Sequence, residues 1–335
     1  MPNAVWRISM NYIESSWYKK KSLMTWLLAP LSGLFFILSS FRKLLFRLGI
    51  AKSFKADIPI IVVGNIGIGG NGKTPFVLWL VPHLESMGLK VGVISRGYGA
   101  KASVYPYELS GTSSVEEAGD EPFLIYNRLQ CPLVIGADRE ASYQILKEKY
   151  KVDVIVSDDG MQHYKMPRAI EFCIIDSKRR FGNGFLIPAG PLRELPSRIN
   201  SVDLAIENGG DSLFSYQLAT SGFYSVKNKA FAENTPNKGI AISAIGSPKR
   251  FEKSLEALGK KLVGRKHFRD HHAYTEQDFT DTEPHAVFMT EKDAVKCQQL
   301  AKNNWYYLKV DATPTKELIE EINQLLKQKG ITYGN

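Results

Sequence analysis

The stretch that decides the fold is Gly67-Ile68-Gly69-Gly70-Asn71-Gly72-Lys73-Thr74, which satisfies every position of the pattern G-x-x-x-x-G-K-[ST]. A continuously apolar run, Ile58–Val63, precedes it, and a helix is predicted over Phe76–Met87. In this setting the glycines let backbone N–H groups turn toward phosphate oxygens, and the helix N-terminus favours an anion. Lys73 can reach the β- and γ-phosphates of a nucleotide, and the Thr74 hydroxyl can ligate Mg²⁺. We therefore predict a phosphate loop whose cofactor-binding residues are Gly67, Gly69, Gly70, Asn71, Gly72, Lys73 and Thr74.

Short apolar runs alternate with helical stretches around this loop. Runs that are apolar throughout are typical of buried strands in a parallel sheet. The predicted strands of the first half are Ile58–Val63, Val91–Ser95, Leu133–Ile135, Val152–Val156 and Phe172–Ile175. The predicted helices are Phe76–Met87, in which Pro82 indicates a kink or a shortened helix, and Arg139–Tyr150. A second α/β stretch consists of Asp203–Ile206, Lys238–Ser243, Lys249–Leu258, Ala286–Thr290 and a final helix near Thr315–Lys327.

The pattern predicts an α/β fold, with a mainly parallel sheet in a P-loop kinase-like domain and a second, smaller α/β domain. A chain of 335 residues suits two domains of ordinary size. We expect a membrane-associated helical region over residues 1–55, the nucleotide-binding domain over 56–172, and a second domain over 173–312 that closes the active-site cleft. A C-terminal helix over 313–335 is expected to pack back on the first domain. Residues 177–200, rich in Arg, Gly and Pro, predict a loop.

The charge of the chain is concentrated at its N-terminal end. The net charge is +9, of which residues 1–55 carry +8 and the other 280 residues only +1. A protein that coats nucleic acid would be basic more generally, so we expect no nucleic-acid partner. Three widely spaced cysteines, Cys131, Cys173 and Cys297, exclude a disulfide framework and fit a reducing compartment.

The basic end contains an uncharged stretch of 20 residues between Lys21 and Arg42. A helix of that length just spans a bilayer, but Pro30 and five Ser or Thr residues weaken this interpretation. An apolar stripe at helical spacing continues past Arg42, through Leu27, Leu31, Leu34, Leu38, Phe41, Leu45 and Leu48. This pattern favours a helix lying in the interface of an anionic membrane; a true span and a core helix are the alternatives, and a signal peptide is not expected.

Polar residues follow several predicted strands, where α/β sheets place their ligands. Ser157, Asp158 and Asp159 follow the predicted strand Val152–Val156, and either aspartate could hold Mg²⁺ through a water.

Thr290-Glu291-Lys292-Asp293 resembles a guanine-reading motif, but its lysine stands one place late, which disfavours a GTPase. His271 and His272 lack further ligands at zinc spacing, and no G-x-S-x-G motif indicates a serine nucleophile.

At these residues the chain resembles the tetraacyldisaccharide 4′-kinases of lipid A biosynthesis. The matching motifs run in the expected order from residue 63 to 297. They are VGNIGIGGNGKTP (63–75), SRGYG (95–99), AGDEP (118–122), DDGMQHY (158–164), RRFGNG (179–184), PAGPLRE (188–194), DHH (270–272) and MTEKDAVKC (289–297). The resemblance implies two α/β/α domains joined by a two-stranded linker. It implies an enzyme, a phosphotransferase with an alcohol acceptor, on the cytoplasmic face of a Gram-negative inner membrane. Its cofactors would be ATP and Mg²⁺, and its product lipid IVA.

The resemblance also assigns roles to matching positions. Asp120 is similar to the acid of an Asp–His catalytic dyad with His271, and Lys73 completes the catalytic set. Thr74, Glu194 and Asp158 are similar to metal ligands. Arg139, Arg193, Asp158 and Asp159 match positions around the nucleotide, and Arg96, Tyr98, Gln162 and His163 match positions around the substrate.

These observations support a mechanism in which His271 orients Asp120, and Asp120 accepts the proton of a sugar 4′-hydroxyl as it attacks the γ-phosphoryl. The expected partners are a lipid-anchored disaccharide 1-phosphate and an anionic inner-membrane surface, and we expect a monomer. The alternative is a membrane-associated P-loop ATPase without a sugar acceptor, which would hydrolyse ATP on its own.

Overall fold

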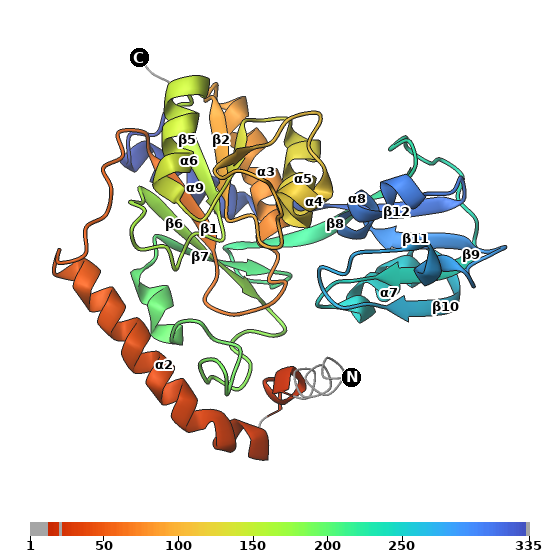
Figure 1. The fold of residues 1–335 in the computed structure, drawn as a ribbon, viewed down its shortest axis with the longest axis horizontal. Helices are drawn as coiled ribbons and strands as arrows, with labels where there is room; N and C mark the ends of the chain where they lie inside the picture. Colours follow the sequence, from red (N-terminus) through yellow and green to blue (C-terminus); the bar gives the residue numbers. More distant parts are fainter. Residues whose placement is uncertain (1–12, 20–21, 333–335) are drawn as a thin grey trace. The chain divides into compact units, whose positions relative to one another are not determined.

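The computed structural model describes residues 13–19 and 22–332 (Figure 1). The chain packs as two compact units, each assembled from separate segments. Unit 1 comprises residues of 1–73, 153–217 and 314–335, and unit 2 comprises 74–152 and 218–313. The predicted four-part division stays a prediction; its boundary after residue 172 falls inside strand β6 (Ile170–Asp176).

Unit 1 is built on parallel strands in the order β8-β7-β6-β1-β5. The bounds are β1 Ile60–Gly64, β5 Val154–Asp158, β6 Ile170–Asp176 and β7 Leu204–Asn208, with the first residues of β8 (Ser215–Ser225) beside β7. Strands β1, β5 and β6 are buried along their whole length, as apolar strands covered on both faces must be. The unit also contains the helices α2 (Leu23–Arg47), η2 (Pro196–Ser201) and α9 (Lys316–Gln328).

The register of this sheet positions the site residues of unit 1. Val63 of β1 lies opposite Asp158 of β5. The carboxyl ends of the two strands therefore meet at one edge, and the segment after β1, residues 65–72, starts beside Asp158 and Asp159. A parallel sheet binds its ligands at this edge.

Unit 2 contains two groups of strands. The first group is β2 (Val91–Ser95), β4 (Leu133–Ile135) and β3 (Tyr107–Glu108). The second has the parallel order β10-β9-β11-β12, with β9 Lys238–Ser243, β10 Lys261–His267, β11 Ala286–Thr290 and β12 Trp305–Pro314. Its helices are α3 (Lys73–Ser86), α4 (Val115–Ala118), α5 (Asp120–Leu129), α6 (Arg139–Ile145), η1 (Leu146–Tyr150), α7 (Pro248–Ala257), η3 (Glu276–Phe279), α8 (Glu291–Cys297) and η4 (Gln298–Leu300).

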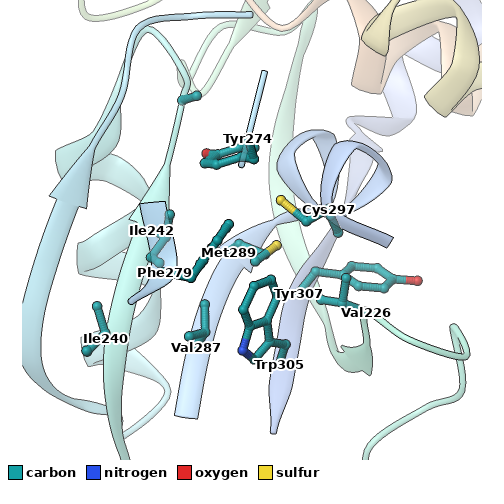
Figure 2. Close-up of a cluster of buried hydrophobic side chains, with 12 residues drawn as sticks. Val226, Ile240, Ile242, Tyr274, Phe279, Val287, Met289, Cys297, Trp305 and Tyr307 are labelled. Atoms are coloured by element: carbon teal, nitrogen blue, oxygen red, sulfur yellow. The ribbon is translucent and has the colours of Figure 1, made fainter. Parts of the chain in front are cut away.

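A hydrophobic cluster fixes the second group of strands (Figure 2). Figure 2 shows Ile240 and Ile242 of β9, Val287 and Met289 of β11, and Trp305 of β12 gathered around Phe279. The Phe279 and Trp305 rings lie 4.2 Å apart between centroids. Ala294 and Cys297 of α8 pack into the same cluster, so the C-terminal half of α8 is held on the sheet.

The α/β fold with mainly parallel strands is confirmed, and most predicted elements lie within two residues of their observed bounds. Helix α3 continues through Pro82 to Ser86, so the proline does not shorten it. Several elements were not predicted, among them α5, α8, β8, β10 and β12. Strands β8 and β12 mix polar and apolar residues without a clean period, and the segment Gly119-Asp120-Glu121-Pro122 predicted a turn where α5 begins. Proline is tolerated in the first turn of a helix because its missing N–H has no partner there anyway.

Helix α2 reverses the usual arrangement of a soluble helix. Its fully buried residues are polar, Thr25 and Ser32, while Leu27, Leu31, Leu34, Leu38 and Phe41 are 53–71% exposed. The core-helix alternative is therefore wrong. By length and composition α2 could cross a membrane, with a mean hydropathy of 1.7 over its most apolar 18 residues.

Candidate active site

The phosphate loop of unit 1 is held by side chains from β7 and β8. The Asn208 amide donates to the Asn71 carbonyl (3.0 Å), and the Tyr216 hydroxyl donates to the Gly72 carbonyl (2.6 Å). Gly72 has φ +95°, and a Cβ there would lie 2.3 Å from the Asn208 amide nitrogen. Only glycine fits both the backbone angle and the space. The backbone N–H of Ile68 donates to Pro191 (2.7 Å), which ties the loop to the segment that carries Arg193 and Glu194.

Asp159 joins the cations of the site. Its carboxylate lies 3.4 Å from the Lys73 ammonium and accepts two hydrogen bonds from the Arg193 guanidinium (3.0 and 3.2 Å). Burial alone would raise the pKa of Asp159, but the charges of Lys73 and Arg193 outweigh it and lower the pKa to about 2. Asp159 also has φ +52°, a left-handed conformation that is strained for a non-glycine residue. The structure therefore brings Lys73, Asp159 and Arg193 together, with Asp159 ionised at neutral pH.

Glu194 is the centre of a second polar network in unit 1. It accepts hydrogen bonds from the Tyr164 hydroxyl (2.6 Å) and the Gln162 amide (3.0 Å). Lys43 of α2 and Arg198 lie within 3.6 Å of the same carboxylate. Burial raises the pKa of Tyr164, so its hydroxyl stays protonated and donates to Glu194. Glu194 is thus engaged on both oxygens.

Mg²⁺ fits the donors that surround the loop. Among the described residues, no three His, Cys, Asp or Glu side chains form a metal-binding group. Mg²⁺ needs fewer protein ligands, because it keeps waters and takes one or two carboxylates together with substrate phosphates. The buried Asp158 carboxylate at the end of β5 in unit 1 is a hard oxygen donor of this kind. The predicted ligand Thr74 is the first residue of unit 2, in the first turn of α3, and its hydroxyl is also a hard oxygen donor. The third predicted ligand, Glu194, would have to exchange existing hydrogen bonds.

Unit 2 contains the predicted pair of Asp120 and His271. Asp120 is the first residue of α5, and the His271 Nδ1 atom lies 2.8 and 3.0 Å from its two carboxylate oxygens. Burial raises the pKa of Asp120, but the His271 hydrogen bond and the charge of Lys292 outweigh it and hold the pKa below its usual value. The hydrogen bond to Asp120 in turn raises the pKa of His271. His271 has φ +61°, the same strained region as Asp159.

The neighbouring histidine has a different function in the fold. The His272 Nε2 atom pairs with Asp278 (3.1 Å), and its ring stacks on Phe268 with centroids 4.5 Å apart. Of the two histidines, His271 is therefore the one that contacts Asp120. The ring of Tyr98 packs against the His271 ring, with 5.1 Å between their centroids.

The remaining predicted site residues divide between the two units. In unit 1, Gln162 bridges Glu194 and Arg193, and His163 is half-buried on the same turn. In unit 2, Arg96 and Tyr98 are exposed after β2, whereas Arg139 is buried and donates to the Gly136 carbonyl (3.2 Å). The roles assigned to these residues stay predictions.

Comparison with known proteins places this geometry in a family. The family model described as "Tetraacyldisaccharide-1-P 4'-kinase" matches residues 24–327. The chain belongs to this family. A tetraacyldisaccharide 4′-kinase from Pseudoalteromonas translucida is 54% identical and covers 97% of this chain and 100% of its own length. Its counterpart from Haemophilus influenzae is 46% identical, over 92% and 93% of the two chains.

A solved structure agrees with the family assignment. The LpxK crystal structure from Aquifex aeolicus, described as its "apo" form in complex with ATP, superposes with a TM-score of 0.76 at 28% identity. The match covers 92% of this chain and 99% of that one. A mainly parallel α/β fold is therefore a property that this chain shares with a solved member of the family.

Sequence reasoning missed several residues that complete these sites. Asn208 and Tyr216 lie in a stretch that matched no motif, so nothing indicated their contacts with the loop. Lys292 lies in the failed guanine motif and in the family motif MTEKDAVKC (289–297), but neither motif gave it a role. The structure shows instead that Thr290 caps α8 through the Asp293 N–H and that Lys292 faces Asp120.

Proposed function

We propose that this protein transfers the γ-phosphoryl group of ATP to the 4′-hydroxyl of a tetraacyldisaccharide 1-phosphate, giving lipid IVA. The observation that carries the proposal is the contact between His271 and Asp120. A phosphate loop serves ATPases and kinases alike, whereas a kinase also needs a group that accepts the proton of an acceptor hydroxyl. A buried, ionised carboxylate held by a histidine is suited to that task.

The phosphates of ATP would bind the residues of the loop. Backbone N–H groups of residues 67–72 and the Lys73 ammonium stabilise the β- and γ-phosphates, and Arg193 adds a second cation beside Lys73. Both cations pair with Asp159 in this structure, so Asp159 keeps them positioned for the phosphates. Mg²⁺, held by Thr74 and Asp158 with Glu194 as a further donor, would neutralise phosphate charge when bound.

The acceptor hydroxyl would give its proton to Asp120. Phosphoryl transfer passes through a loose transition state in which the nucleophile is little bonded, so a carboxylate of low pKa suffices as proton acceptor. His271 donates to both oxygens of Asp120 and holds the carboxylate in one orientation. We assign substrate contacts to Arg96, Tyr98, Gln162 and His163, and nucleotide contacts to Arg139.

The acceptor determines where the enzyme works. A molecule with four acyl chains rarely leaves a bilayer, so the enzyme must reach it at the membrane. The exposed apolar face of α2 and the basic residues around it support binding to the interface of an anionic membrane. We place the protein at the inner membrane, peripheral on the cytoplasmic face.

The test is transfer of label from γ-labelled ATP to tetraacyldisaccharide 1-phosphate in detergent by Asp120→Ala. We expect kcat to fall at least about 100-fold, because a general base usually accelerates a reaction by at least about this factor. The KM for ATP should change little. The matched control is Asp278→Ala, which breaks the neighbouring Asp–His pair and should keep most of the activity. A kcat loss below about tenfold in Asp120→Ala would show that Asp120 is not the proton acceptor.

A further inference from the structure

Lys292 lies among three carboxylates that flank the Asp120–His271 pair. Its ammonium is 2.9 Å from Glu121, 3.0 Å from Asp270 and 3.6 Å from Asp120. Asp120 and Glu121 begin α5, and Asp270 directly precedes His271. One cation on α8 therefore contacts both segments that carry the pair.

The burial of this group makes its charge important. The Lys292 side chain is 15% exposed and that of Asp120 only 5%. Three carboxylates this close together repel one another, so their negative charge needs a cation beside it. Lys296, one turn further along α8, lies 4.0 Å from Asp120 but 3.1 Å from Asp293, so it belongs mainly to another pair. Lys292 is therefore the lysine that contacts Asp120, Glu121 and Asp270 together.

Contacts of the neighbouring residues hold Lys292 in position. Thr290 caps the helix through the Asp293 N–H, and Asp293 accepts a hydrogen bond from the backbone N–H of Ala244 (3.1 Å). Glu291, which directly precedes Lys292, accepts a hydrogen bond from Arg128 of α5 (2.7 Å). The start of α8 is thus fixed on both sides of Lys292.

We propose that Lys292 is a positioning residue for the proton-accepting pair: it balances the negative charge of Asp120 and its neighbours and holds the segment of His271 against the start of α5. This inference rests on the function proposed above. Lys292 does not bind the transferred phosphate itself, because its ammonium is already occupied by three carboxylates. The other ionisable groups that face the pair are Glu121, Asp270, Lys296 and the Tyr98 ring.

The sign of the effect follows from the charges. The Lys292 cation lowers the pKa of both Asp120 and His271, although the hydrogen bond to Asp120 still raises that of His271 overall. Removing the cation leaves Asp120 and Asp270 beside the imidazole, so the imidazolium becomes more favourable. The pKa of His271 should therefore rise in Lys292→Met.

The experiment compares Lys292→Met, which keeps the length of the side chain, with Lys292→Arg, which keeps the charge. The control is Lys260→Met, which removes another buried lysine of unit 2 whose partner is the Thr235 carbonyl. The His271 resonances, assigned by their loss in His271→Gln, are titrated by NMR in the full-length protein. We expect a titration midpoint about 0.5 pH unit or more higher in Lys292→Met, and unchanged in Lys260→Met and Lys292→Arg.

Kinetics supply the second readout. We expect Lys292→Met to lower kcat about tenfold or more with little change in the KM for ATP, and Lys292→Arg to restore most of it. If Lys292→Met does not fold, Lys292→Met/Glu121→Gln, which removes one carboxylate with the cation, replaces it. An unchanged His271 midpoint in the folded variant would overturn the inference. The titration needs no lipid, so it tests Lys292 even if the proposed acceptor is wrong.

Discussion

Asp120 and His271 are separated by 151 positions in the sequence, yet their side chains share a hydrogen bond. The family resemblance predicted this pair, but no local pattern predicts the contact, and neither the resemblance nor any pattern indicated the cation that balances it. Lys292 lies in a motif that the sequence analysis quoted without giving it a function. Its role depends on which carboxylates surround it, and this follows only from the packing of α5 on α8.

The His271 contact predicts a pH dependence of stability. Its pKa is raised in the folded state above the ordinary 6.5, so it contributes stability that is present below pH 6.5 and is lost as the pH rises through the folded value. His271→Ala should therefore destabilise the protein more at pH 6 than at pH 9. Urea unfolding of the two proteins at both pH values measures this difference. A destabilisation that is the same at both would show that the histidine is not charged in the pair.

Lys73 and Asp159 give a prediction for nucleotide affinity. Lys73→Ala removes a cation from the phosphates and leaves Asp159 with Arg193 alone, so the carboxylate repels the incoming nucleotide more strongly. We expect the Kd for ATP to rise about tenfold or more, as for the loss of a charged hydrogen bond. The variant Lys73→Ala/Asp159→Asn should recover part of the lost affinity. Isothermal titration of ATP measures both, and a double variant no better than Lys73→Ala would contradict the repulsion.

Among the elements, the sequence pattern of α2 predicted its apolar stripe but not the contacts of its opposite face. The spacing of leucines predicted one apolar stripe, and the structure confirms that this stripe is exposed. The sequence did not show how the opposite face is held. Ser32 donates to the Leu186 carbonyl (2.7 Å) and accepts from the Ala189 N–H (3.0 Å), and the Asn183 amide contacts Thr25. These polar partners lie in a loop whose path has no periodic signal, so no pattern could have paired them with α2.

The two faces of α2 give a prediction about the membrane. Leu27, Leu31, Leu34 and Leu38 changed together to Ser should lower binding to vesicles with anionic lipids about tenfold or more, because each leucine loses apolar surface to bury. ATP affinity and the unfolding temperature should change little, since these side chains touch solvent in the protein. The control is Leu213→Ser, an equally exposed leucine in unit 1 outside α2. Vesicle binding equal to that of the unchanged protein would exclude α2 as the membrane contact.

Strand β8 is an element that the sequence pattern did not predict. Its residues, Ser215–Ser225, are partly polar and only partly buried, so neither alternation nor a continuous apolar run marks it. Yet Tyr216 at its start holds the phosphate loop through the Gly72 carbonyl. β-propensity predicts strands that bury one face regularly. It does not predict a strand whose burial changes along its length, as that of β8 does.

For the whole molecule, the question is whether ATP turnover depends on an acceptor. Family membership, the loop and the Asp120–His271 pair all agree with a kinase. A membrane-associated ATPase would use the same loop but would have no need for a buried, ionised Asp120 held by a histidine.

The most direct measurement follows ADP and lipid phosphate together, using γ-labelled ATP and purified full-length protein in detergent, with and without tetraacyldisaccharide 1-phosphate. A kinase should form little ADP without the lipid and, with it, should form ADP and 4′-labelled lipid in equal amounts. Rapid ADP formation that is independent of the lipid, with no label in it, would contradict the account and identify an ATPase.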